Sequence, residues 1–238
     1  MKNKNKLGFS LLELLLAVAL LLVISGAIFS VIANMQSRYL AEESRLTAVD
    51  STREFVDQMV RDLHQNAFPH PRMFAPSFTG TQPYANASIA AGMVVAIPTQ
   101  VQFEANLDGS ASGVQVIVYR LTKNGALVTD LTQCPCVLQR GQQAKVNGVA
   151  PESQAGPPFT TEVDNVINPA TEPLFRFFDQ SGNELTGLPA FNSAASNGGA
   201  IAAVYAVKIS VTVQGQTADP KTHLYPEVTY TATAQMNN

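Results

Sequence analysis

The feature that most constrains this chain is an unbroken apolar run close to its N-terminus. Leu14 to Ala33 are twenty residues without a charge. A helix rising about 1.5 Å per residue covers the roughly 30 Å hydrocarbon core of a bilayer with that length. Three lysines precede the run, at positions 2, 4 and 6. By the positive-inside rule, the short leader is expected in the cytoplasm and everything after Ser37 outside it.

Glu13 places a carboxylate at the start of this apolar run, where a charge is unfavourable unless something stabilises it. A charge in a membrane helix costs about 2.5 to 3.5 kcal/mol at the centre and less near an end, so it is usually paired. Cleavage after Gly8 would create an α-amino group on Phe9, and Glu13 would be the fifth residue of the cut chain. Residues four apart share a helix face, so Glu13 could pair with its own terminus or with that of an adjacent subunit. An incidental Glu at the membrane edge is the alternative.

The run G-F-S-L-L-E at residues 8–13, behind a basic leader, resembles the class III leader of type IV prepilins and type II secretion pseudopilins. The resemblance implies that prepilin peptidase cuts between Gly8 and Phe9 and N-methylates Phe9. It also implies that Glu13 pairs with the amino group of a neighbouring subunit during filament assembly. The partners expected from it are prepilin peptidase, other pilin or pseudopilin subunits, and inner-membrane lipid.

Two other interpretations of the N-terminus stay open. An ordinary secretory signal peptide could be cut at Ser25-Gly26-Ala27, so that the mature chain begins at Ile28. Against it, the apolar region exceeds the usual 7 to 15 residues, contains Glu13, and continues its helical pattern past the cut. An uncut membrane anchor is also possible, but it leaves the spacing of Gly8, Phe9 and Glu13 unexplained.

The charge balance argues against a nucleic-acid partner. The chain carries a formal charge of −3, which loss of the three leader lysines would bring to −6. The region beyond Pro69 has no basic cluster. Surfaces that bind nucleic acid need concentrated positive charge.

No pattern of catalytic or metal-binding residues stands out in the sequence. It contains no H-E-x-x-H, G-x-S-x-G or P-loop motif, and its three histidines are isolated at positions 64, 70 and 223. His64 is expected on the solvent side of its helix. We therefore expect a protein that is not an enzyme and that has no cofactor or metal site.

Residues 38–67 contain no Pro or Gly and predict that the helix continues from the membrane into water. Pro69 and Pro71 predict its end, because Pro lacks an N–H and disfavours helix in the residue before it. Apolar residues at three-, four- and seven-residue steps predict one stripe that packs on a sheet or a neighbouring helix. The predicted stripe consists of Leu46, Val49, Val56, Val60, Leu63 and Ala67.

Beyond Pro71 the pattern changes to strands and turns. Asn124-Gly125 predicts a hairpin, since both central residues of a type I′ turn need positive φ. Residues 207–213 alternate apolar and polar, as in a half-buried strand. The Pro-rich stretch 141–173 and the stretch 186–200, rich in Gly, Ala, Ser and Asn, predict surface excursions. Strand-like runs are predicted at 93–97, 101–104, 114–122, 126–129, 174–178, 207–213 and 228–236.

Together these segments predict an α+β fold in which a long N-terminal helix covers an antiparallel β-sheet. The strand motifs at 118–121, 137–140 and 175–179 look like those of the larger J-type minor pseudopilins and W-type minor pilins. The predicted divisions are a cleaved leader (1–8), a transmembrane half-helix (9–37), an amphipathic half-helix (38–68) and an extracytoplasmic β-rich domain (69–238).

Cys134 and Cys136 are the only two cysteines, and outside the cytoplasm they would meet an oxidising compartment. In an extended strand their Cα atoms would lie near the upper end of the roughly 4.4 to 6.8 Å range for a disulfide, so a bridge needs a turn. Pro135 makes a turn possible. A local or intermolecular disulfide is the first expectation, free thiols the second, and an incomplete metal site the third.

The sequence thus predicts a structural subunit, a minor pilin or minor pseudopilin of a type IV pilus or type II secretion filament. Its helix would be anchored in the inner membrane and its β-rich domain would be periplasmic. The alternatives are a membrane-tethered periplasmic binding module and a secreted protein released after Ala27.

Overall fold

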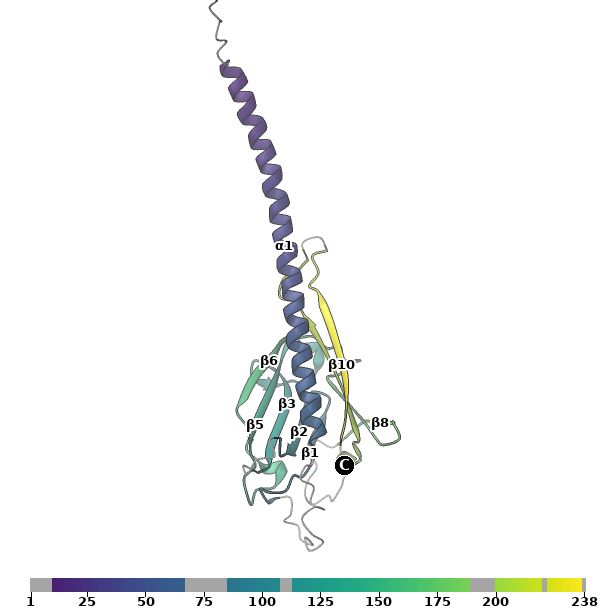
Figure 1. Cartoon of the computed structure of the whole chain (residues 1–238). Coiled ribbons are helices and arrows are strands. Elements are labelled where there is room, and N and C mark those ends of the chain that lie inside the picture. The colour runs from purple at the N-terminus through teal and green to yellow at the C-terminus, as the bar shows by residue number, and fades with distance from the viewer. Residues whose placement is uncertain (1–9, 67–84, 108–112, 189–199, 220–221, 237–238) are drawn as a thin grey trace, which may run out of the picture.

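A computed structural model describes residues 10–66, 85–107, 113–188, 200–219 and 222–236. One long helix dominates it (Figure 1). Helix α1 (Leu11–His64) has 54 residues, which corresponds to a length of about 80 Å. It runs without a break from the predicted membrane span into the domain that follows, as the sequence predicted.

The rest of the described chain forms one curled antiparallel sheet, so the expected α+β class is confirmed. The strand order is β1-β2-β3-β5-β6-β9-β7-β8, with β10 also paired to β9 and β4 to β3. The strands are β1 (Met93–Ile97), β2 (Gln100–Ala105), β3 (Gln115–Lys123), β4 (Ala126–Leu127), β5 (Cys136–Ala144), β6 (Phe159–Val166), β7 (Phe175–Phe178), β8 (Glu184–Leu185), β9 (Ala206–Gln214) and β10 (Glu227–Gln235). Short 3₁₀ helices lie at Leu131–Gln133, Pro151–Ser153 and Ala200–Ala203.

The predicted hairpin between β3 and β4 is confirmed. Asn124 and Gly125 have φ angles of 52° and 81°. These are the positive values that a type I′ turn requires, and Gly adopts them without steric cost.

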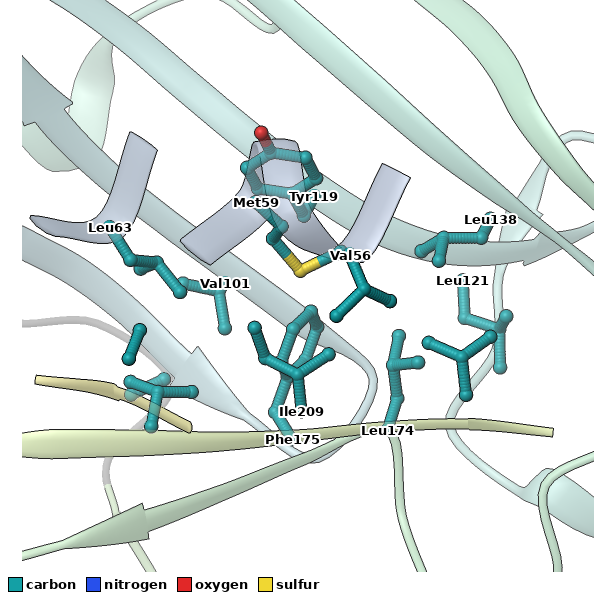
Figure 2. Close-up of a cluster of buried hydrophobic side chains, with 14 of the residues drawn as sticks. Val56, Met59, Leu63, Val101, Tyr119, Leu121, Leu138, Leu174, Phe175 and Ile209 are labelled. Carbon is teal, nitrogen blue, oxygen red and sulfur yellow. The ribbon is translucent and has the colours of Figure 1, made fainter. Parts of the chain in front are cut away.

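The core lies where the sheet curls around the C-terminal half of α1. Figure 2 shows Val56, Met59 and Leu63 of the helix among side chains from two parts of the sheet. One part is β2, β3 and β5, and the other is β7 and β9. The Phe55 ring meets the Tyr119 ring edge to face, with centroids 5.6 Å apart. One set of helix residues therefore ties both parts of the sheet into a single core.

The predicted apolar stripe of the helix is wrong in part. Leu46 is 56% exposed, because it lies on a face of α1 that the sheet does not cover. Phe55 and Met59 were missing from the prediction, yet both are buried. The helix ends at His64, where the N–H of Gln65 bonds to the carbonyl of Asp62 and the N–H of Asn66 to that of Leu63; Ala67 lies outside the described residues. The buried helix positions are Ala41, Thr52, Phe55, Val56, Met59, Asp62 and Leu63.

The prediction that 141–173 is a surface excursion is also wrong in part, since only 145–158 and 167–173 lie outside the strands. This stretch contains the end of β5 and all of β6, and it buries Val163 and Val166 in the core. Gly141 allows the close packing here, because a Cβ at that position would lie 2.6 Å from Cγ of Pro157 and 2.9 Å from the Phe159 ring. The glycine and proline that suggested a loop are thus used for tight contact between neighbouring strands.

Strand β9 is not half-buried as its alternating pattern predicted. It pairs with β10 along one edge and with β7 and β6 along the other. Its polar residues Ser210 and Thr212 are buried as well, because their hydroxyls pair with those of Thr231 (3.3 Å) and Thr229 (2.9 Å) on β10. These residues lie on the face of β9 opposite its core valines, where the Asn168 side chain also bonds the carbonyl of Ser210 and the N–H of Thr212.

We expect Met59→Ala to lower the free energy of unfolding by about 2–5 kcal/mol, since it removes a fully buried side chain and leaves a cavity. Leu46→Ala is the matched control on the same helix and should change it by less than about 0.5 kcal/mol. Chemical unfolding of the detergent-solubilised chain, followed by circular dichroism, measures both. Equal losses for the two variants would contradict the observed packing face.

Candidate processing and assembly site

Helix α1 begins directly after the predicted cleavage point. Gly8 and Phe9 lie outside the described residues. Ser10 is the N-cap of the helix, with its hydroxyl accepting a hydrogen bond from the N–H of Leu12 at 3.3 Å. Cleavage after Gly8 would therefore leave Phe9 and Ser10 ahead of the first helical residue.

Glu13 lies in the first turn of α1 and is exposed. Ser10 and Glu13 have the spacing of a capping box, in which the third helical residue is Glu or Gln. A carboxylate in the first turn is also favoured by the positive end of the helix dipole. Glu13 thus has a local structural role available in addition to pairing with an amino group.

The apolar half of α1 is not covered by any other described part of the chain. None of residues 11–34 is buried against the described chain, and Figure 1 shows this half standing clear of the sheet. It is long and apolar enough to cross a membrane. Large contiguous apolar surface is not left in water by a stable protein, so lipid or other apolar helices must cover it.

The polar side chains near the end of this half are satisfied within the helix. Nδ2 of Asn34 donates to the carbonyl of Ser30 at 3.0 Å, and the Ser37 hydroxyl donates to the carbonyl of Ala33 at 2.6 Å. Such i to i−4 bonds are how short polar side chains are accommodated in lipid. The span is therefore chemically compatible with a bilayer up to the first charge, Arg38.

A polar cluster of Asp62, Tyr119 and Arg140 fastens the other half of α1 to the sheet. Oδ2 of Asp62 accepts from the Tyr119 hydroxyl at 2.6 Å and from Nη2 of Arg140 at 2.8 Å. Nε of Arg140 also lies 3.1 Å from the Tyr119 hydroxyl. Burial raises the pKa of Tyr119 well above its usual value, and the Asp62 carboxylate adds to the shift. The phenol therefore stays protonated and donates to Asp62.

Sequence reasoning missed this cluster, although one signal was present. Asp62 follows Met59 by three residues and precedes Leu63, so it lies on the apolar face of the helix. A carboxylate on such a face needs a buried cation or donor. Which strand residues would supply them could not be read from the sequence, because Tyr119 and Arg140 are 57 and 78 residues away.

Cys134 and Cys136 are joined by a disulfide, with Cα atoms 4.6 Å apart. The chain turns between them through a cis peptide bond before Pro135. Cys136 opens β5 and is buried, while Cys134 packs against the core. The structure therefore brings these two predicted residues together, far along the chain from Glu13.

The described residues contain no group of three or more His, Cys, Asp or Glu side chains that could hold a metal ion. His64 is exposed on α1, as the sequence predicted, and His70 lies outside the described part of the chain.

The N-terminal part of the chain matches a known family. A family model described as the prokaryotic N-terminal methylation motif covers residues 3–29, which include Gly8, Phe9 and Glu13. No curated protein and no solved structure matches the chain. The motif supports a prepilin-type N-terminus, the kind that prepilin peptidase processes, and it fits anchoring in the inner membrane. It marks a structural pilin type rather than an enzyme family.

We expect Asp62→Asn to lower the free energy of unfolding by about 2–4 kcal/mol, because it leaves the largely buried Arg140 cation without its carboxylate. Asp50→Asn, at an exposed position of the same helix, should change it by less than about 0.5 kcal/mol. Adding Arg140→Met to Asp62→Asn should recover part of the loss, since the unpaired charge is then removed. Urea unfolding measures all three, and equal effects of the two single variants would show that the cluster does not stabilise the fold.

Proposed function

We propose that this chain is a minor pilin or minor pseudopilin, a structural subunit of a type IV pilus or type II secretion filament. The observation that carries the proposal is the position of the methylation motif. It leads without interruption into a helix whose apolar half is bare and whose other half is packed on a β-sheet. A binding module on a tether needs no such continuity between span and domain.

Maturation would change the electrostatics of the helix start. Prepilin peptidase would cut between Gly8 and Phe9 and methylate the new α-amino group, which remains a cation. A cation near the positive end of a helix dipole is unfavourable. The Glu13 carboxylate of the same or a neighbouring subunit offsets that cost, and pairing between subunits would fix their axial offset.

Assembly would replace lipid around the apolar half of α1 with the helices of other subunits. Between helices in a membrane, packing and polar contacts decide association, because lipid is as apolar as the side chains. The chain would thus begin in the inner membrane with its domain in the periplasm, where the Cys134–Cys136 bridge would form. It would then enter the filament through the same helix surface.

The finer proposal is a subunit of the J type among pseudopilins or the W type among minor pilins. Its support is that the strand motifs at 118–121, 137–140 and 175–179 all fall at least partly on strands of one sheet, β3, β5 and β7.

Processing is tested by the mass of the mature N-terminus. Wild type should begin at a methylated Phe9, and Gly8→Glu should stay at full length in the membrane, because the peptidase must accommodate a small residue at the cut. A wild-type chain that begins at Ile28, or a Gly8→Glu chain that still begins at Phe9, would disprove prepilin-type maturation.

Assembly is tested by separating the charge of Glu13 from its capping role. Glu13→Gln keeps the capping-box residue type but removes the charge, and Glu13→Leu removes both. If Glu13 pairs with an amino group, both variants should lose most co-purification with partner pilins or pseudopilins from detergent-solubilised membranes. The N-terminal mass should stay normal in both.

Glu54→Gln is the matched control, because it removes an exposed carboxylate from the same helix outside the membrane span. It should co-purify as wild type does. Normal partner recovery with Glu13→Gln, together with loss for Glu13→Leu, would show that Glu13 acts as a helix cap and not as an ion-pair partner.

A further inference from the structure

The β9–β10 hairpin runs alongside α1 with its tip directed toward the membrane-spanning half. Near the middle of β10, the Tyr230 hydroxyl donates to Oδ1 of Asp57 at 3.3 Å. Just past the end of β9, the N–H of Gln216 donates to the hydroxyl of Ser44 at 2.8 Å. Moving toward the tip of the hairpin therefore means moving toward the N-terminus of the helix (Figure 1).

The described residues of the tip, 215–219 and 222–226, reach the level of Arg38. Asp219 and Pro226 of the hairpin line one groove of about 620 Å³ together with Arg38 and Ala41 of the helix. The N–H of Asp219 donates to the carbonyl of Leu224 at 2.9 Å, which holds these two residues next to each other.

This level coincides with the headgroup layer of a bilayer. Arg38 is five residues beyond Ala33, after which polar side chains begin with Asn34, and five residues rise about 7.5 Å along a helix. A bilayer of about 40–45 Å with a core of about 30 Å has a headgroup layer of roughly 5–7.5 Å on each side.

Both elements present large apolar side chains to solvent at this level. Leu224 is 70% exposed and Tyr225 is 48% exposed on the hairpin, and Tyr39 is 70% exposed and Leu40 54% exposed on the helix. Tyrosine is enriched at membrane interfaces, where its ring meets the acyl boundary and its hydroxyl stays wet.

The charges of the groove suit a zwitterionic surface. Arg38 and Arg45 contribute two cations, and three carboxylates also line it, those of Glu42, Asp219 and Glu227. A strongly anionic surface would be repelled by the carboxylates, whereas a phosphate with an adjacent ammonium can meet both signs.

We propose that the tip of the β9–β10 hairpin is a second membrane contact, which rests through Leu224 and Tyr225 on the headgroup layer of zwitterionic phospholipid. The contact is continuous with the transmembrane half of α1 and rests on the proposed insertion of that helix. With two points of attachment, the domain has a fixed tilt on the membrane before assembly. A second copy of the chain is the other possible cover for this surface, and the test separates the two.

The chain contains no tryptophan, so Tyr225→Trp places a single fluorophore at the proposed contact. The full-length variant is reconstituted into vesicles of phosphatidylethanolamine and phosphatidylcholine, both zwitterionic, with and without lipid brominated near the headgroup end of the acyl chains. The tryptophan introduced by Tyr225→Trp should emit at shorter wavelength than in water and lose a large part of its fluorescence to the brominated lipid. Adding Leu224→Ser should reduce that quenching.

Two matched variants control the measurement. Val146→Trp, at a half-exposed position past the end of β5, should show water-like emission without lipid quenching. Phe29→Trp, within the span, should be quenched by lipid brominated deep in the acyl chain. Absence of that quenching in the Phe29→Trp variant would overturn membrane insertion itself, and with it the proposed function.

If the Phe29→Trp variant is quenched and the Tyr225→Trp variant is not, the membrane contact is overturned. A blue shift of the Tyr225→Trp variant that grows with protein density and is insensitive to brominated lipid would assign the surface to a second copy. Circular dichroism of each variant confirms that the sheet is retained.

Discussion

The apolar half of α1 has no stable place in water, and the rest of the structure depends on that constraint. It is a continuous surface of Leu, Val, Ile and Phe with no cover from the described part of its own chain. Burial of apolar surface stabilises by about 25 cal/mol per Å², so this half must be held either by lipid or by neighbouring helices. The two environments are alternatives of similar polarity. A helix of this kind can therefore be exchanged between a membrane and a filament without a change in its own fold.

The C-terminal half of the same helix is held at one position on the sheet. Phe55, Val56, Met59 and Leu63 are all buried, but apolar contacts are not directional, so they alone do not fix the helix at one position. The cluster of Asp62, Tyr119 and Arg140 removes that freedom, since its hydrogen bonds are made in one register only. Its contribution is to specify position, which buried polar groups are known to do in some folds.

The sequence predicted the elements whose signal is local. The apolar span, the Asn124-Gly125 hairpin and the alternation along β10 each depend on residues within a few positions of one another, and the α+β class follows from their order. The prediction failed where distant residues decide. The loop expected at 141–173 contains β6, because Gly141 accommodates the Phe159 ring 18 residues later. The fully buried pair of Glu104 and Lys145, with Nζ and Oε2 2.6 Å apart, and the Asp62 cluster likewise depend on strand register that no local pattern contains.

The packing of α1 along the sheet has a mechanical consequence. The helix enters the domain from one end and is gripped along its C-terminal half by both parts of the curled sheet (Figures 1 and 2). A pull on the N-terminal half, directed along the helix axis, is therefore resisted by the contacts of Phe55, Met59 and the Asp62 cluster in parallel. Contacts sheared together resist force better than contacts peeled one after another. Tension applied to the helix would therefore be shared among several buried contacts and not borne by one of them at a time.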